Sequence, residues 1–156
     1  MLDDVGVDGF RLDAIRHLVE EGSAQVDTAA THTWLRDFRR AITEITPGAL
    51  LVGEVYDVGA SSSQYVPEDV DMVFDFDTAE ATVDAIGSGQ GGQLLTAVGD
   101  AARLFGRGER ATFLTNHDQE RVASDLGEES DALALAGRML MAGPGVPFVY
   151  YGEEIG

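Results

Sequence analysis

The stretch Gly6–His17, GVDGFRLDAIRH, decides the fold predicted for this chain. It begins as a strand, in which alternate side chains share a face. Arg11 and Asp13 therefore share a charged face, and the apolar residues beside them share the other. A positive charge next to an Asp favours the ionised carboxylate, which prepares Asp13 to act as a nucleophile. The alternative interpretation is a half-buried strand that carries a structural ion pair.

Strand-like apolar segments alternate with helical patterns along the rest of the chain. Further strands are predicted at 49–55, 71–76, 111–116 and 146–151, and helices at 14–22, 32–46, 78–86, 93–105 and 131–142. In helix 32–46 the apolar stripe consists of Trp34 or Leu35, Phe38, Ile42 and Ile45. Strands interleaved with helices indicate an α/β protein with a parallel sheet.

Polar residues stand at the carboxyl ends of the predicted strands: Asp13, Glu54, Asp75 or Asp77, Asn116–Asp118 and Glu153–Glu154. A (β/α)8 barrel builds its active site from those strand ends. A doubly wound sheet would instead use a Gly-rich first turn and helix N-termini. A complete barrel has eight strands and about 250 residues, so the predicted fold class is α/β, a partial (β/α)8 TIM barrel with about five of eight βα units.

The composition is strongly acidic, with 28 Asp and Glu against 10 basic residues, all of them Arg, and a formal net charge of −18. Such a surface repels nucleic-acid phosphates and anionic membranes, whereas a neutral sugar is compatible with it. One hypothesis is adaptation to high salt, which screens the repulsion between dense carboxylates. The other is a GC-rich genome that favours Arg codons, which explains the missing Lys but not the acidic excess.

If the acidic surface reflects adaptation to salt, the melting temperature should rise as salt is added, because screening relieves the self-repulsion of the folded state. Thermal unfolding over a series of NaCl concentrations measures this. A melting temperature that stays flat or falls would contradict the hypothesis.

The sequence places few limits on the cellular compartment. There is no Cys, and therefore neither a disulfide framework nor a thiolate metal site. No apolar run reaches the roughly 18 residues that a transmembrane helix needs, and the N-terminus lacks the pattern of a signal peptide. We expect a soluble protein, either cytoplasmic or secreted, whose original N-terminus lies upstream. The oligomeric state stays open.

Two of the carboxylates suit cleavage of a bond between sugars. That reaction needs one carboxyl group to protonate the leaving oxygen and another to attack or stabilise the cationic carbon. Asp13 and Glu54 end neighbouring predicted strands, so their carboxyl groups are expected to lie about 5–5.5 Å apart, the spacing of a retaining mechanism. Asp13, beside Arg11, is the better nucleophile. Glu54, in an apolar stretch with no basic neighbour, is the better proton donor.

Three later motifs strengthen this interpretation: LVGEVYD at 51–57, FLTNHDQER at 113–121 and GVPFVYYGEEIG at 145–156. Together with the opening stretch, in this order and spacing, they resemble the α-amylase family of glycoside hydrolases. The resemblance implies a nucleophile at Asp13 and an acid/base at Glu54. It also implies that Asp118 is a third carboxylate, which grips sugar hydroxyls and stabilises the transition state.

The resemblance further implies four substrate-binding residues. Arg11 matches the arginine that orients the nucleophile, and His117 matches a histidine that hydrogen-bonds the sugar at the cleavage point. Arg16 and His17 match positions that contact the next sugar. In calcium-binding members the carbonyl at the His17 position coordinates the ion, so a structural calcium is compatible with the resemblance, although the chemistry requires no cofactor. The metal ligands are otherwise unknown.

By the same resemblance, residues 1–156 are the C-terminal part of the catalytic barrel, strands four to eight. The N-terminal barrel strands, the inserted domain and the C-terminal β domain would then lie outside the chain, and we expect the chain alone to be inactive. The predicted function is retaining hydrolysis of α-glucosidic bonds in starch-like α-glucans or maltooligosaccharides by double displacement.

Three alternatives to this function remain open. The first is an oligo-1,6-glucosidase, an α-glucosidase or a transglycosylase of the same family. The second is a catalytically inactive barrel that serves as a scaffold. The third is a metal-dependent barrel hydrolase, which the absence of a His-x-His cluster disfavours.

Overall fold

The computed structural model describes residues 6–56, 61–127 and 129–155. The chain divides into two compact units, Met1–Phe74 and Asp75–Gly156. Asp57 and Gly156, which belong to two of the sequence motifs, lie outside the described residues. Within the described ranges, no helix is long and apolar enough to cross a membrane.

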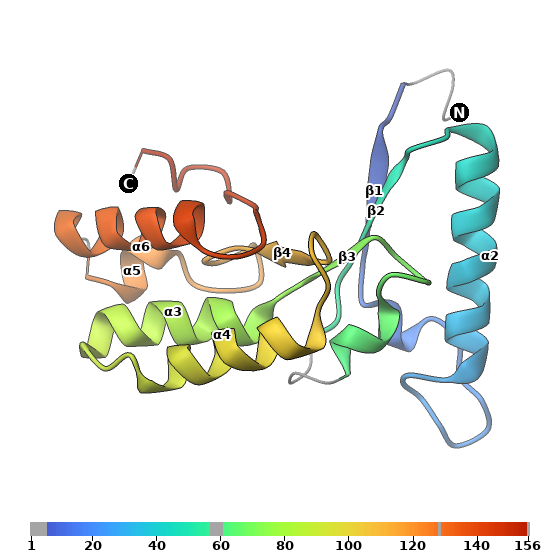
Figure 1. Ribbon diagram of the computed structural model, residues 1–156, viewed down its shortest axis with the longest axis horizontal. Coiled ribbons are helices and arrows are strands. Elements are labelled where there is room, and N and C mark those ends of the chain that lie inside the picture. Colours follow the sequence, from blue (N-terminus) through green and yellow to red (C-terminus); the bar gives the residue numbers. More distant parts are fainter. Residues whose placement is uncertain (1–5, 57–60, 128, 156) are drawn as a thin grey trace. The chain divides into compact units, whose positions relative to one another are not determined.

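In residues 6–56 and 61–74, the first unit has three parallel strands, one long helix and two short 3-10 helices; the long helix and the strands are labelled in Figure 1. The elements are β1 Gly9–Leu12, η1 Ile15–His17, α2 Ala29–Ile45, β2 Leu50–Gly53, η2 Ser62–Tyr65 and β3 Met72–Phe74. Strand β2 pairs with both β1 and β3, and Leu12 lies opposite Gly53 at the carboxyl ends of the first pair. Consecutive strands are therefore parallel neighbours, as the alternating pattern predicted. The connection between β1 and β2 contains the predicted long helix, and the one between β2 and β3 contains only the 3-10 turn Ser62–Tyr65, which was not predicted.

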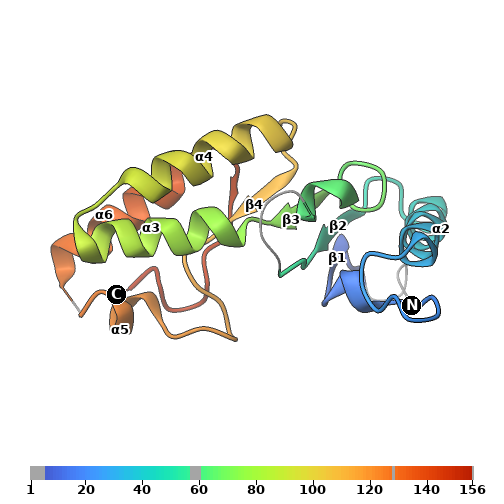
Figure 2. The same ribbon diagram turned by 90° about the horizontal axis from the view of Figure 1, so that it is seen from below.

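Helix α2 lies alongside β1 and β2 (Figures 1 and 2). It begins after Thr28, whose side chain accepts a hydrogen bond from the backbone N–H of Thr31 at 3.1 Å, the usual way to satisfy a free helix N-terminus. Its buried apolar positions are Leu35 and Ile42, whereas Trp34 is 45% exposed. The predicted stripe therefore holds at Leu35 and Ile42, with Leu35 in the buried place for which Trp34 was the alternative. The prediction is wrong at Ile45, which is 51% exposed near the end of the helix.

The chain turns sharply after β1, and the helix predicted at 14–22 is wrong. Ala14 adopts a left-handed backbone conformation with φ of 43°, which L-residues rarely occupy and which interrupts a helix. Only the single 3-10 turn Ile15–His17 follows. The backbone N–H of Ile15 donates to the carbonyl of Glu54 at 3.0 Å, so this turn is held by the end of the neighbouring strand.

Over the residues that the structure describes, the second unit has two parallel strands and four helices; the helices are labelled in Figure 2. The elements are α3 Phe76–Ser88, α4 Gly92–Leu104, β4 Arg110–Thr112, α5 Val122–Asp125, α6 Ser130–Ala142 and β5 Val146–Pro147. Helix α3 packs against both α4 and α6. The core of the second unit contains apolar side chains from α5, from α6 and from the segments that follow β4 and α5: Leu114, Val122, Leu126, Ala136 and Leu140.

The predicted elements beyond the first turn are largely confirmed. Helices predicted at 32–46, 78–86, 93–105 and 131–142 are α2, α3, α4 and α6. The strands are shorter than predicted, most of all β5, which covers only Val146–Pro147 of the predicted 146–151. The short helix α5 was not predicted, because four residues are too few to show a helical period.

Asp27 holds three parts of the first unit together. Its carboxylate accepts hydrogen bonds from Arg16 at 2.6 Å, from Tyr65 at 2.7 Å and from Ser61 at 3.1 Å. Burial by itself raises the pKa of Asp27, but the hydrogen bonds from Tyr65 and Arg16 and the charge of Arg16 outweigh it, so the pKa lies below its ordinary value. Burial, followed by the hydrogen bond to Asp27, raises the pKa of Tyr65.

This cluster predicts a loss of stability in acid. A carboxylate whose pKa is lowered by folding stabilises the protein above its unfolded-state pKa, and the stabilisation disappears as the pH falls through the folded-state pKa. The Asp27→Asn variant should therefore have a lower melting temperature than the wild type at pH 7. This difference in melting temperature should shrink as the pH falls below about 4, near the ordinary pKa of Asp. Thermal unfolding between pH 7 and pH 2.5 measures it.

Asp37→Asn is the matched control, because Asp37 is an exposed residue of α2 whose side chain is 61% accessible and forms an ion pair with exposed Arg40 at 2.8 Å. Surface pairs of this kind contribute little to stability, so the melting temperature of Asp37→Asn should stay close to that of the wild type at every pH. A difference in melting temperature for Asp27→Asn that is the same at pH 3 and pH 7 would contradict the role given to its charge.

Candidate active site

One arginine joins the two carboxylates at the ends of β1 and β2. Asp13 directly follows β1, and Glu54 directly follows β2. Nη1 of Arg11 donates to Oδ1 of Asp13 at 2.7 Å, and Nη2 of the same side chain pairs with Oε2 of Glu54. The two carboxylates that the sequence predicted for the chemistry therefore lie within the span of one guanidinium group.

The backbone fixes this pair from both sides. The N–H of Glu54 donates to the carbonyl of Leu12 at 2.9 Å, and the carbonyl of Glu54 accepts from the N–H of Ile15 at 3.0 Å. Gly53 makes the arrangement possible, because a Cβ added there would lie 2.6 Å from Cδ1 of the fully buried Ile15. The residues on either side of Asp13 are thus bonded to Glu54.

The two carboxylates differ in their surroundings. The side chain of Asp13 is 76% exposed, whereas that of Glu54 is 12% exposed. The prediction that Glu54 has no basic neighbour is wrong, since Arg11 reaches it from the adjacent strand. Asp13 is open to a ligand from solution, and Glu54 is enclosed beside it.

Arg16 is tied into the protein, and His17 lies at the surface. The Arg16 side chain is 14% exposed, and besides its contact with Asp27 its Nη1 donates to the carbonyl of Tyr56 at 3.3 Å. Tyr56, two residues beyond Glu54, is 64% exposed. His17 ends η1 and its side chain is exposed. The substrate contacts implied for Arg16 and His17 stay predictions.

His117 and Asp118 belong to the second unit, where a turn presents them to solvent. Oδ1 of Asn116 accepts a hydrogen bond from the N–H of Asp118 at 2.9 Å, which is an Asx turn. Nε2 of His117 lies 3.3 Å from Oδ2 of Asp118, and the two side chains are 58% and 65% exposed. The Asx turn at Asn116–Asp118 therefore carries two exposed side chains, those of His117 and Asp118.

Two other carboxylates at strand ends have structural contacts. Asp75 is buried, accepts from the N–H of Thr78 at 3.1 Å and so caps α3. It also forms an ion pair with buried Arg110 at 2.6 Å. Glu153 accepts hydrogen bonds from Thr115 and from the backbone of Tyr150. The position of a carboxylate at a strand end is therefore not enough to identify a site residue.

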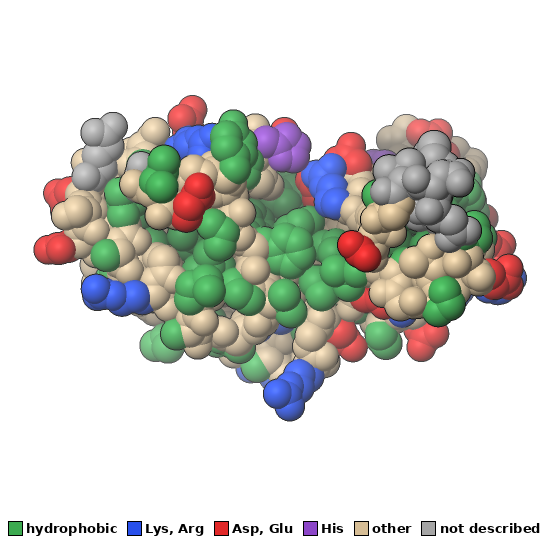
Figure 3. Space-filling model, turned by 90° about the horizontal axis from the view of Figure 1, so that it is seen from above, with side chains coloured by type: hydrophobic (Ala, Val, Ile, Leu, Met, Phe, Trp, Pro, Cys, Tyr) green, Lys and Arg blue, Asp and Glu red, His purple; other side chains and the backbone are tan. Residues whose placement is uncertain are grey.

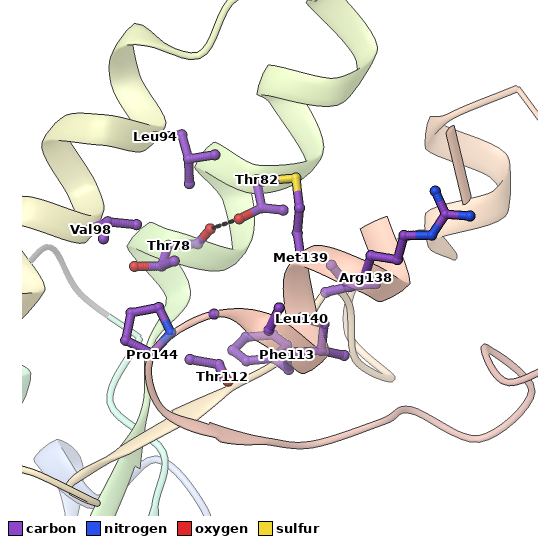
Figure 4. A pocket seen from close by; sticks show the side chains of 13 residues that line it. Thr78, Thr82, Leu94, Val98, Thr112, Phe113, Arg138, Met139, Leu140 and Pro144 are labelled. Atoms are coloured by element: carbon purple, nitrogen blue, oxygen red, sulfur yellow. Dashed lines mark hydrogen bonds between the residues drawn. The ribbon is translucent and has the colours of Figure 1, made fainter. Parts of the chain in front are cut away.

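A cavity in the second unit lies apart from the predicted site residues. It has a volume of about 370 Å³ and lies among α3, α4, β4 and α6, with apolar side chains such as Leu94, Val98 and Phe113 in its lining (Figure 4). Of the predicted site residues, all of which the structure describes, none lines it. The cavity is therefore not the candidate active site.

Within residues 6–56, 61–127 and 129–155, no group of three or more His, Cys, Asp or Glu is arranged to hold a metal ion. The structural calcium that the resemblance allows stays a prediction, because calcium also binds backbone carbonyl oxygens such as the one expected at His17.

Comparison with known proteins gives a consistent result. The family model described as "Alpha amylase, catalytic domain" matches residues 1–156. Alpha-amylase 3 of Dictyoglomus thermophilum is 34% identical over 155 residues, which cover 97% of this chain and 30% of that protein. A trehalose synthase of Thermus thermophilus is 28% identical over 188 residues, covering 98% of this chain and 20% of that protein.

A solved structure confirms the fold. The crystal structure of an alpha-amylase from H. orenii superposes with a TM-score of 0.78 at 34% identity, covering 97% of this chain and 31% of that one. The partial (β/α)8 barrel predicted from the sequence is therefore confirmed. The chain spans about a third or less of the length of these relatives. Since the family model matches the chain from its first residue to its last, the protein belongs to the α-amylase family.

Proposed function

We propose that this protein is a retaining glycosidase of the α-amylase type, which cleaves α-glucosidic bonds in starch-like α-glucans or maltooligosaccharides by double displacement. The observation that carries the proposal is the contact of the Arg11 guanidinium with both Asp13 and Glu54. Two carboxyl groups held by one such group fit the close spacing of about 5–5.5 Å in retaining enzymes, rather than the wider spacing that leaves room for a water molecule.

In the first step, Asp13 attacks the anomeric carbon while Glu54 gives its proton to the departing glycosidic oxygen. Asp13 is suited to attack because it is exposed and its carboxylate is held by the Arg11 guanidinium. A sugar that covers Asp13 excludes water, which disfavours a second negative charge beside it and so favours a proton on Glu54. The products are a glycosyl ester on Asp13 and the released leaving group.

In the second step, the ionised Glu54 takes a proton from water, and the resulting nucleophile releases the sugar from Asp13 with its α configuration retained. The contact with Arg11 stabilises the carboxylate form of Glu54 that this step needs. By resemblance to the family, Asp118 and His117 grip the sugar hydroxyls. Arg16 and His17 are assigned to the next sugar on the same ground.

A sibling activity is the second candidate. The 28% identity to a trehalose synthase favours a transglycosylase that follows the same first step. The two functions differ in what releases the sugar from Asp13, namely water or the hydroxyl of a second sugar. Incubation with maltose followed by separation of the sugars distinguishes them, because hydrolysis yields glucose and transfer yields a different disaccharide.

Two substitutions in the whole protein test the proposal. Asp13→Asn removes the nucleophile and Glu54→Gln removes the exchangeable proton, so each should lower turnover of a chromogenic α-maltooligosaccharide by about 10³-fold or more, as loss of such groups does in other enzymes. Asp37→Asn, the exposed residue on α2, is the matched control and should keep wild-type turnover. Full activity in either site variant would contradict the catalytic role proposed for the residue that it replaces.

A folded wild-type protein that cleaves no α-glucoside would also overturn the proposal. It would point to the catalytically inactive scaffold instead.

A further inference from the structure

The turn that carries Asp118 is attached at its start to the segment after β5. Thr115, directly before Asn116, donates its hydroxyl hydrogen to Oε1 of Glu153 at 2.7 Å. The other oxygen of Glu153 accepts from the N–H of Tyr150 at 3.1 Å, and the N–H of Glu153 donates to the carbonyl of Tyr150 at 3.0 Å. Tyr150–Glu153 is therefore a closed turn whose carboxylate is directed at Thr115. Thr115 is buried, at 4% exposure.

The same closed turn holds the other end of the Asp118 segment. The guanidinium carbon of Arg121 lies 4.6 Å from the centre of the Tyr150 ring and 4.4 Å from that of Tyr151, which is cation–π geometry. Its Nη1 donates to the carbonyl of Tyr151. Gly152 has φ of +91°, and a Cβ added there would lie 3.0 Å from the Arg121 Nη1. The backbone of the turn thus leaves the space that Arg121 fills.

Between these two attachments lie the exposed side chains of the turn. His117 and Asp118 are 58% and 65% exposed, so packing does not orient them. Their direction follows from the backbone, which the Asx turn shapes and which Thr115 and Arg121 hold at its two ends. A reacting group must be held within a fraction of an ångström of its productive position, usually by such supporting contacts.

We propose that Thr115, Glu153 and Arg121 are positioning residues, which clamp the Tyr150–Glu153 turn to both ends of the Asn116–Asp118 turn and so set the direction of the Asp118 carboxylate. This inference rests on the proposed function, in which Asp118 acts on the substrate. The opposing interpretation is that the clamp only stabilises the second unit. The two interpretations differ in whether the effect of the clamp depends on Asp118.

A double-mutant cycle in the whole protein separates them. Thr115→Val keeps the shape of the side chain and removes its hydroxyl, and Thr115→Ser restores a hydroxyl. In the wild-type background Thr115→Val should lower kcat/KM on a chromogenic α-maltooligosaccharide by about 10- to 100-fold, the cost of a displacement of about 1 Å. In an Asp118→Asn background the same change should cost less than about threefold, because residues that act as one unit are not additive.

Two further variants support the cycle. Thr115→Ser should recover kcat/KM to within about threefold of the wild type, since the hydroxyl again reaches Glu153. Arg121→Lys keeps the charge but loses the planar stacking on Tyr150 and Tyr151, so it should lower kcat/KM as Thr115→Val does. Arg107→Lys, at an exposed position after α4, is its matched control and should leave activity unchanged. If Thr115→Val does not fold, Arg121→Lys takes its place in the cycle.

The outcomes are distinct. Equal losses from Thr115→Val in both backgrounds, or a lower melting temperature with unchanged kcat/KM per folded molecule, would overturn the clamp and leave the proposed function intact. Full activity of Asp118→Asn itself would instead overturn the role given to Asp118, and the clamp with it. A loss confined to the background that contains Asp118 supports the inference.

Discussion

The candidate chemistry depends on the contact of the Arg11 guanidinium with both Asp13 and Glu54. The parallel pairing of β1 and β2 makes this contact possible. The register sets Leu12 opposite Gly53, so the next residues, Asp13 and Glu54, emerge side by side. Arg11, which belongs to β1, contacts both carboxylates and offsets their mutual repulsion. The neighbouring turn adds the backbone bonds that keep Glu54 in place.

The local sequence was enough to locate the strands, the ends of β1 and β2, and most of the helices. Apolar periodicity is strong over α2, α3, α4 and α6, and the polar residues after β1 and β2 mark where those strands stop. Asp13 and Glu54 could be paired in advance because consecutive βα units place their strands side by side.

The errors arise where a contact distant in sequence overrides the local pattern. The segment at 14–22 reads as a helix, but the N–H of Ile15 bonds to Glu54, 39 positions away, and Ala14 takes a left-handed conformation. The prediction that Glu54 lacks a basic neighbour failed for the same reason, since Arg11 belongs to a different strand. Between Trp34 and Leu35, adjacent on one helix stripe, only the tertiary packing decides which is buried.

Exposure and partner divide four of the carboxylates at strand ends, other than Glu54, into structural and reactive candidates. Asp75 is buried against Arg110 and a helix N-terminus, and Glu153 binds Thr115 and a backbone N–H. Asp13 and Asp118 are largely exposed, which leaves their oxygens accessible to a ligand. Sequence position alone treats all four alike, because neither exposure nor partner is encoded in the local pattern.

The central claim is that Asp13 is the nucleophile of a retaining reaction, and trapping the covalent intermediate tests it most directly. The whole protein would be treated with a fluorinated α-maltosyl fluoride, whose glycosyl ester forms readily and hydrolyses slowly, then digested and analysed by mass spectrometry. We predict one added fluorinated maltosyl group on the peptide that contains Asp13, and none in the Asp13→Asn variant. A sugar on Glu54, Asp118 or any other carboxylate, or turnover of the reagent without a labelled peptide, would contradict the account.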